Sequence, residues 1–396
     1  ASGNGGQIAV NGDVIQLKAR SDIQANAKTA GNGGKIVVMS NKSTTVAGSL
    51  SAQGGSSVGN GGLIETSSKR ILQLGKNLQV DAGARASTGK AGTWLLDPYD
   101  LTIDSASAQT ISAALNTSNV RVEVNALGCS GLGVCTSNGT GSLTLAANAT
   151  IEKVSGAATS LTLVADGHIN IFGNILSQVG APLDVILNSA STVTIDANAN
   201  IRANQITAVA QAIDVRGGVF SYGTDINNSS PLIALLAGRI SVTGVLKANN
   251  QNATAGKGGK ITIEGDDEVV IANATITANG FDGGEVEIIS LNGNVNITQS
   301  YIQTNGGQGR GGAISVAGLQ QTTLTATTLE ATGYTQGGKI LIGNDASNGT
   351  LPFSLITSLD KNTVLNTQAL NPSSQLGGFI ETSGHTLNQL EIGRAH

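Results

Sequence analysis

Residues 31–38 are Gly-Asn-Gly-Gly-Lys-Ile-Val-Val, and the Gly-Asn-Gly-Gly turn also begins at Gly3 and at Gly59, which gives a period of 28 residues. A fixed repeat of this length is typical of a solenoid, because one repeat cannot bury its apolar face alone and must stack on its neighbours. The turn therefore predicts the fold more directly than any other feature of the chain.

Alternating residues follow the paired glycines. After the Gly-Gly at 258–259, Ile261 and Ile263 are separated by one residue, so they lie on the same face of a strand and are expected to point inward. Because other strand-like segments and turn residues fill each period, roughly three short strands fit in each coil. We predict an all-β fold, a right-handed parallel β-helix (solenoid) with loop insertions, whose hand follows the preference for right-handed crossovers. Similar Gly-Gly phrases precede residues 7–10, 35–38, 63–66, 285–288, 313–316, 339–342 and 379–382.

The spacing of these phrases suggests three regions. Residues 1–104 and 251–396 carry regular repeats, whereas residues 105–250 lack Gly-Gly turns of this type but retain strand-like runs. We interpret all three as one continuous rod, with loop insertions in the middle region. Residues 106–115 could form a helix or remain part of the coil, because their serines and threonines are weak helix formers.

The composition excludes several classes of protein. Charged residues make up 12% of the chain, the net charge is −4, and 54 residues are glycine. So much glycine disfavours a helical protein, and a disordered chain would carry more charge. No basic stripe is present, so nucleic-acid binding is not expected. The longest apolar stretch, residues 232–237, is too short to span a membrane.

Three phrases resemble filamentous-haemagglutinin-like exoproteins of two-partner secretion, which are large bacterial adhesins. They are Gly-Gly-Leu-Ile-Glu-Thr-Ser at 61–67, Gly-Lys-Ala-Gly-Thr-Trp-Leu-Leu-Asp-Pro-Tyr-Asp-Leu-Thr-Ile at 89–103 and Gly-Gly-Phe-Ile-Glu-Thr-Ser-Gly-His-Thr-Leu at 377–387. The resemblance implies a β-helical shaft that is secreted or held at the surface of a Gram-negative bacterium. It also implies export of the parent protein through an outer-membrane β-barrel transporter, and a role in adhesion or biofilm cohesion.

The two cysteines, Cys129 and Cys135, lie close together in a glycine-rich segment. In an exported chain such a pair is expected to oxidise, so we predict a disulfide that closes a small loop. A metal site would need more thiolate or imidazole ligands than the surrounding sequence offers.

Trp94 and the repeated asparagines each have two interpretations. Trp94 could be a stacking platform for carbohydrate, but a large side chain filling a gap in the rod is the simpler hypothesis. Asn4, Asn32 and Asn60 occupy the same repeat position and should stack as a structural ladder of hydrogen bonds. Alternatively, such a row could meet a repetitive ligand.

Binding by an adhesin segment of this kind is expected in loops that interrupt the coils. The loop around Cys129 and Cys135 and the stretch that contains Phe220 and Tyr222 are the candidates. The expected ligands are an exopolysaccharide, a host glycan or a cell-surface receptor. The competing hypothesis is a purely structural stalk without a ligand.

An enzyme is the rival class, because polysaccharide lyases and glycosidases also use parallel β-helices. Such chemistry needs convergent carboxylates on one exposed face, or acidic metal ligands with a basic residue. The three histidines show no catalytic or metal-binding pattern, so we assign no catalytic residue, metal or cofactor. The carboxylates considered are Asp266, Asp267 and Glu268, which could form a site only in a loop, and the trio Asp97, Asp100 and Asp104.

Overall fold

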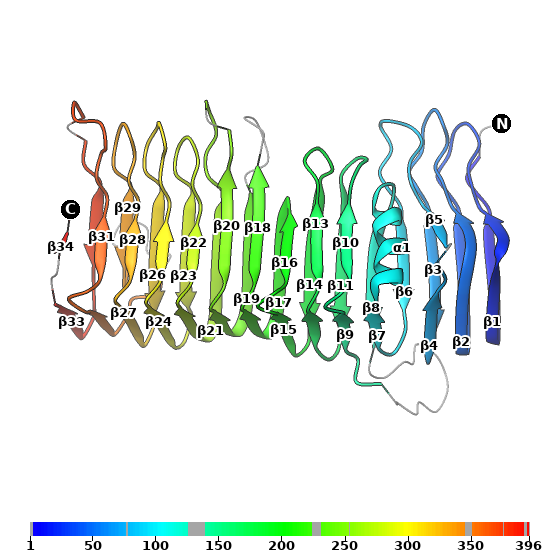
Figure 1. The fold of residues 1–396 in the computed structure, drawn as a ribbon, viewed down its shortest axis with the longest axis horizontal. Coiled ribbons are helices and arrows are strands. Elements are labelled where there is room, and N and C mark those ends of the chain that lie inside the picture. The colour runs from blue at the N-terminus through cyan, green and yellow to red at the C-terminus, as the bar shows by residue number, and fades with distance from the viewer. Residues whose placement is uncertain are drawn as a thin grey trace. The chain divides into compact units, whose positions relative to one another are not determined.

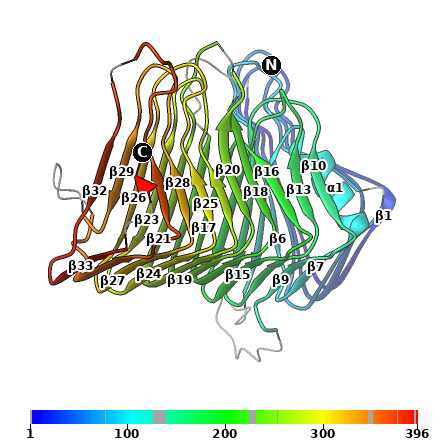
Figure 2. The ribbon, with the colours of Figure 1, turned by 60° about the vertical axis from the view of Figure 1, so that its left-hand side comes forward.

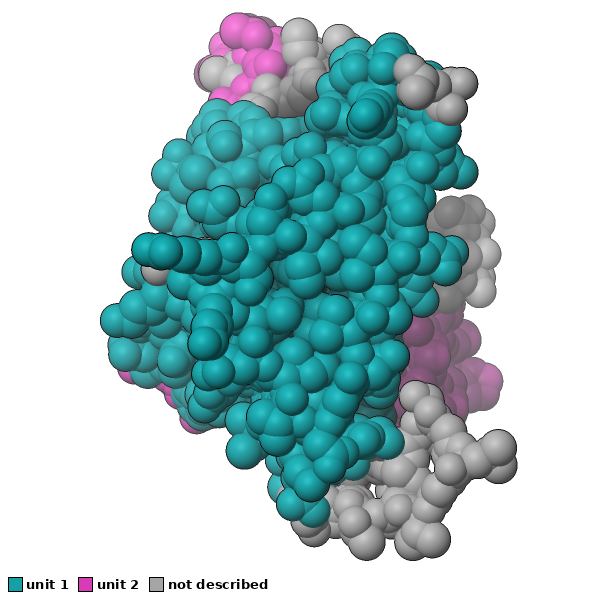
Figure 3. All heavy atoms as spheres, turned by 90° about the vertical axis from the view of Figure 1, so that its right-hand side faces the viewer, with its two compact units in different colours: residues 1–193 teal, residues 194–396 magenta. Residues whose placement is uncertain are grey.

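A computed structural model describes residues 3–76, 78–125, 139–223, 231–252, 254–344, 351–374, 376–391 and 394–395. The chain forms two compact units, unit 1 (residues 1–193) and unit 2 (residues 194–396), which Figure 3 shows in teal and magenta. Both units consist of parallel strands stacked coil upon coil. The prediction of an all-β parallel solenoid is confirmed. The right-handed winding, the three sequence regions and the single continuous rod stay predictions.

The elements of unit 1 are β1 (Gln7–Gln24), β2 (Lys35–Ser51), β3 (Leu63–Ser68), β4 (Ile71–Leu74), β5 (Gln79–Asp81), β6 (Thr93–Asp97), β7 (Leu101–Ile103), α1 (Ser105–Leu115), β8 (Asn119–Val124), β9 (Leu143–Leu145), β10 (Thr150–Lys153), β11 (Thr159–Ala165), β12 (Ile169–Ile171), β13 (Asn174–Ser177) and β14 (Leu183–Ser189). Strand β15 (Thr192–Ile195) contains the boundary residues of the two units.

The strands of unit 2 are β16 (Asn200–Ala203), β17 (Gln205–Val215), β18 (Gly218–Gly223), β19 (Leu232–Val242), β20 (Val245–Asn250), β21 (Lys260–Ala272), β22 (Thr275–Thr277), β23 (Glu285–Ser290), β24 (Asn294–Thr298), β25 (Tyr301–Gln303), β26 (Ala313–Gly318), β27 (Gln321–Thr325), β28 (Thr328–Glu330), β29 (Lys339–Ile342), β30 (Ile356–Leu359), β31 (Val364–Asn366), β32 (Phe379–Thr382), β33 (Leu387–Leu390) and β34 (Arg394–Ala395).

Unit 1 is built by pairing each strand with its equivalent in the next coil. One stack of parallel strands runs through β1, β2, β3, β6, β8, β11 and β14, and its first three strands each follow a Gly-Gly turn. Gln7 faces Lys35 and Lys35 faces Leu63, so the sequence period is also the register of the sheet. The repeat thus satisfies the backbone hydrogen bonds of each coil with those of its neighbours.

Unit 2 repeats this plan on three faces of each coil (Figures 1 and 2). One face stacks β17, β19, β21, β23, β26, β29 and β32. A second stacks β21, β24, β27, β30 and β33, and a third runs from β16 to β34 through β18, β20, β22, β25, β28 and β31.

The core of each unit lies inside the coils. Ile261 and Ile263 are 0% exposed, as the alternation predicts, and they stack on Val286 and Ile288 of the next coil, which are also buried. Period-two alternation continues through most strands, because successive side chains of a strand point to opposite faces.

Each Gly-Gly turn ends the loop that connects the last strand of one coil to the first strand of the next. The second glycine donates its N–H to the carbonyl at the start of this loop. Gly34 donates to Ala25 at 2.7 Å, and Gly312 donates to Thr304 at 2.7 Å. Glycine is required because a Cβ on Gly312 would lie 2.1 Å from the carbonyl oxygen of Gly284 in the preceding coil. In unit 2 the loops that precede the Gly-Gly turns lie along one edge of the coils, at the top of Figure 1.

Helix α1 takes the place of a strand in one coil, and it contacts β5 on one side and β10 on the other. Asp104 caps its N-terminus by accepting the N–H of Ser107 at 2.8 Å. At the other end, the buried Lys153 donates its Nζ to the carbonyl of Leu115 at 2.7 Å. Burial lowers the pKa of Lys153 to about 8. The sequence left open whether residues 106–115 form a helix or part of the coil, and the structure shows a helix.

Candidate binding groove of unit 2

The residue that precedes each Gly-Gly pair forms a column along the coils. In unit 1 this column is the asparagine ladder: Asn4 Oδ1 accepts the backbone N–H of Asn32 at 2.8 Å, and Asn32 Oδ1 accepts that of Asn60 at 2.9 Å. Asn60 Oδ1 continues the ladder by accepting the N–H of Lys90 at 2.9 Å. The amide oxygens of these asparagines are therefore bonded to the backbone of the next coil.

In unit 2 the same column contains charged residues in place of most of the asparagines. Lys257 pairs with Asp282, and Arg310 pairs with Gln336, so these residues lie in successive coils. Asp282 alone repeats the ladder bond, since its Oδ1 accepts the N–H of Arg310 at 2.8 Å. Lys257 and Arg310 are exposed, and each projects a long cationic side chain where unit 1 has a short amide.

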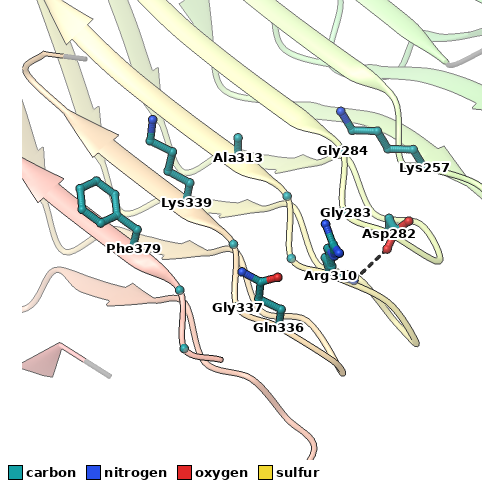
Figure 4. A pocket seen from close by; sticks show the side chains of 15 residues that line it. Lys257, Asp282, Gly283, Gly284, Arg310, Ala313, Gln336, Gly337, Lys339 and Phe379 are labelled. Carbon is teal, nitrogen blue, oxygen red and sulfur yellow. Dashed lines mark hydrogen bonds between the residues drawn. The ribbon is translucent and has the colours of Figure 1, made fainter. Parts of the chain in front are cut away.

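A groove of about 740 Å³ runs beside this column (Figure 4). Its floor is the paired glycines of successive coils, which present backbone and no side chain. One side carries the column of Lys257, Asp282, Arg310 and Gln336, and the first residues of the following strands, Ala313, Lys339 and Phe379, form the other side. The groove thus crosses five coils and follows the direction in which they stack.

The groove is electropositive. Among the described residues no carboxylate forms an ion pair with Lys257 or Arg310, and Asp282 is the groove's single acidic residue. The Nζ of Lys339 lies 5.9 Å from the ring centroid of Phe379, whose side chain is 52% exposed. The groove therefore carries two exposed cations, Lys257 and Arg310, along its column side.

Sequence analysis missed this groove, although a signal was present. Aligning the residue before every Gly-Gly pair would have placed Asn4, Asn32 and Asn60 in one set and Lys257, Asp282 and Arg310 in another. We considered only the asparagines. Unequal coil lengths in unit 2 hide the column until the register of the strands is known.

The structure describes only part of the loops that we expected to bind. Phe220 and Tyr222 lie on β18, where their rings stack with centroids 6.2 Å apart and planes at 3°. Both are partly exposed, and burial raises the pKa of Tyr222. Cys129 and Cys135 lie outside the described residues, so their disulfide stays a prediction.

Trp94 is 0% exposed and packs in the core stack between Ile64 and Val120 of the neighbouring coils. Its Nε1 donates to Thr66 Oγ1 at 2.9 Å, which satisfies the buried indole. A buried ring offers no face to a sugar, so the geometry matches the gap-filling hypothesis.

The candidate carboxylates do not converge. Asp104 caps α1, and Asp100 accepts the backbone N–H of Thr140 at 3.0 Å. Asp266, Asp267 and Glu268 lie within β21 and not in a loop. Within the described part of the chain, no group of three or more histidine, cysteine, aspartate or glutamate residues is placed to hold a metal ion.

The histidines are separate as well. The Nδ1 of His168 lies 3.3 Å from Ser191 Oγ, and His385 contacts the edge of Phe353 with ring centroids 5.4 Å apart. Neither contact includes a carboxylate, so neither forms the nucleophile, base and acid arrangement of a hydrolase.

Asp97 has a perturbed pKa and supports a testable prediction. Burial, with a smaller contribution from the charges of Glu123 and Glu65, raises its pKa from 3.8 to about 6, although Asn125 Nδ2 donates to it at 2.9 Å. Between pH 4 and pH 6 Asp97 is protonated in the folded chain and ionised in the unfolded chain. The free energy of unfolding therefore falls as the pH rises from 4 to 6. We expect Asp97 to contribute a loss of about 2 kcal/mol over this range.

Urea unfolding at pH 4 and pH 7 measures this effect, with the Asp97→Asn variant as the comparison. The asparagine cannot ionise but still accepts from Asn125, so its stability should change less between the two pH values. Identical pH dependence in the two proteins would contradict the assignment.

Comparison with protein-family models, with curated proteins and with solved structures finds no match for this chain. No helix among the described residues is long and apolar enough to cross a membrane.

Proposed function

We propose that this chain is a segment of a secreted or cell-surface adhesin of a Gram-negative bacterium, and that unit 2 binds its ligand in the groove. The filamentous-haemagglutinin-like phrases at 61–67, 89–103 and 377–387 support the assignment to a two-partner secretion exoprotein. The parent protein would then reach the surface through an outer-membrane β-barrel transporter. Its role is attachment or biofilm cohesion.

The exposed cations of the groove are the observation that carries this proposal. Stacking the coils does not require them, because short amides occupy the same column in unit 1 and bond the coils together. Lys257 and Arg310 form no ion pair among the described residues. Such charges gain energy mainly from a partner that brings the opposite charge.

Binding of the purified chain to intact bacteria and to immobilised exopolysaccharides and host glycans tests the proposal. The variant Lys257→Asn/Arg310→Asn places the ladder residue of unit 1 at both positions and should keep the fold. Saturable binding that this variant weakens supports an adhesin with its site in the groove. Absence of binding to every target would favour the structural stalk.

The alternative of a polysaccharide lyase or glycosidase makes a different prediction. A glycosidase needs two carboxyl groups that flank the scissile bond, and the groove contains only Asp282. We expect the purified chain to bind polysaccharides without shortening them. Release of new reducing ends would favour a glycosidase, and release of unsaturated sugars would favour a lyase.

A further inference from the structure

We infer that the outer face of β16, β18 and β20 binds an acidic sugar unit of a glycan, with the sugar ring on Phe220 and Tyr222 and its carboxylate on Arg202. These three strands lie side by side in Figure 1. The site goes beyond the groove, with which it shares no residue. Its choice of a saccharide rests on the proposed adhesin function.

Two aromatic rings follow each other along β18. Phe220 and Tyr222 are two residues apart and Ser221 between them is buried, so both rings are on the outer face of the strand. Their planes differ by 3° and their centroids lie 6.2 Å apart. Both side chains are partly exposed. An aromatic face in this position can pack against the apolar C–H face of a sugar ring.

A glycine makes room for the ring of Phe220. Gly218 is the preceding outward position of β18, and a Cβ there would lie only 2.6 Å from Cζ of Phe220. The same Cβ would lie 2.6 Å from Oδ1 of Asn200, the register partner of Gly218 in the preceding coil. The ring of Phe220 therefore lies back over Gly218, in space that only a residue without a side chain leaves free.

Two cations flank Phe220. Arg202 is its register partner in the preceding coil and Lys247 in the following one, so each backbone lies about 4.8 Å from that of Phe220. Arg202 is exposed, Lys247 is partly exposed, and neither forms an ion pair among the described residues. Burial raises the pKa of Tyr222 and the charge of Arg202 opposes this rise, so the guanidinium lies near the phenol as well.

The charge of this face favours an acidic ligand. In strands β16, β18, β20, β22, β25, β28 and β31 the only carboxylate is that of Glu330 on β28. Glu330 lies three coils beyond Lys247, and it already accepts the hydroxyl of Tyr301. The planar guanidinium of Arg202 can bind a carboxylate through two parallel hydrogen bonds. A carboxylated sugar thus uses both the rings and the cations.

Calorimetric titration of the purified chain with trigalacturonate and with a hyaluronan hexasaccharide tests the inference. We expect saturable binding to at least one of them. The methyl ester of the same oligosaccharide keeps the C–H faces but loses the charge, so it should bind about tenfold more weakly. Equal binding of acid and ester would overturn the inference, as would binding of a single-stranded oligonucleotide in place of the saccharides.

A pair of charge variants locates the carboxylate. Arg202→Gln/Lys247→Gln should weaken binding of the acid about tenfold and leave the weaker binding of the ester unchanged, since only the acid carries the charge. The control Arg20→Gln/Lys35→Gln removes the same charge from exposed positions of unit 1 and should bind like the parent chain. Equal losses in the two pairs would assign the effect to net charge and overturn the inference.

Two further variants test the ring. Phe220→Leu keeps an apolar side chain but removes the flat face, and Gly218→Ala places a Cβ where the ring lies. Both should remain folded in thermal unfolding and should weaken acid and ester alike, because stacking does not depend on charge. Phe172→Leu replaces an exposed phenylalanine of unit 1 and should have no effect. Unchanged binding in both ring variants would overturn the inference.

The same titrations separate this inference from the proposed function. If the purified chain binds intact bacteria but neither acidic oligosaccharide, the inference fails and the adhesin function stands. If it binds an acidic oligosaccharide through Arg202 and Phe220 but the groove variant Lys257→Asn/Arg310→Asn still binds bacteria normally, the inference stands and the groove loses its assigned role.

Discussion

Replacing Val269 with aspartate should destabilise unit 2 by about 4 kcal/mol, because the carboxyl group would enter the core without a partner. Val269 is 0% exposed and lies between Ile240 and Val295 of the neighbouring coils, which are also buried. Urea unfolding of the purified chain measures the loss. Hydrogen exchange at the amides of β19, β21 and β24 should show that the loss is centred there.

The next residue supplies a matched control. Val270 is on the same strand, is the same residue type and points to the opposite face, where Ser241 and Asn296 are its register partners. Val270→Asp should cost less than about 1 kcal/mol, because the carboxylate remains in contact with water. Equal losses at the two positions would contradict the inward and outward assignment of β21.

The second large effect is expected at the floor of the groove. Gly312→Ala should cost about 3 kcal/mol, since overpacking against a fixed backbone forces the coils apart. The added Cβ would lie 2.1 Å from the oxygen of Gly284 and 2.8 Å from the Cβ of Thr304. Gly284 cannot move away without breaking its own N–H bond to Ala278, which is 2.7 Å long.

Gly307 is the control for this prediction because it lies in the loop of the same coil. A Cβ there would meet only the oxygen of Gly280, at 3.6 Å, which is ordinary contact. Gly307→Ala should change the stability by less than about 0.5 kcal/mol. Thermal unfolding of both variants decides the matter, and a Gly312 variant as stable as the Gly307 variant would refute the close-stacking explanation.

Sequence reasoning was successful where a residue type has one structural use. Alternating apolar residues can be buried only by a strand, so Ile261 and Ile263 could be assigned to the core before the structure was known. The Gly-Gly pairs were recognised as turns for a similar reason. The sequence alone did not show that they also permit close contact between coils, which depends on the register of the neighbouring coil.

Helix α1 illustrates the limit of local propensity. Its serines and threonines left residues 106–115 undecided, because such residues are weak helix formers. The helix is stabilised by distant groups, since Lys153 and Thr159 both donate to the carbonyl of Leu115, at 2.7 and 2.8 Å. These contacts exist only after the next coil has stacked on the helix.

The groove shows the same limit for function. Lys257, Asp282, Arg310 and Gln336 are separated by unequal lengths of chain, so no fixed period connects them. Their alignment comes from the strands that follow, which stay in register whatever the length of the loop between them. The groove therefore could not be predicted from the spacing that revealed the fold.

The sequence by itself determined the parallel solenoid, its inward-facing side chains and its glycine turns, because these follow from the repeat period and from the alternation of residues within each strand. Only the tertiary structure decided which polar side chains bond the coils together and which line the groove. Asn4 and Lys257 hold equivalent places before a Gly-Gly pair and both are exposed, yet Asn4 Oδ1 accepts the N–H of Asn32 in the next coil, whereas an ammonium group can accept no such bond. The reason is physical: a hydrogen bond between coils joins residues far apart in the chain, and their distance is set only when the coils stack.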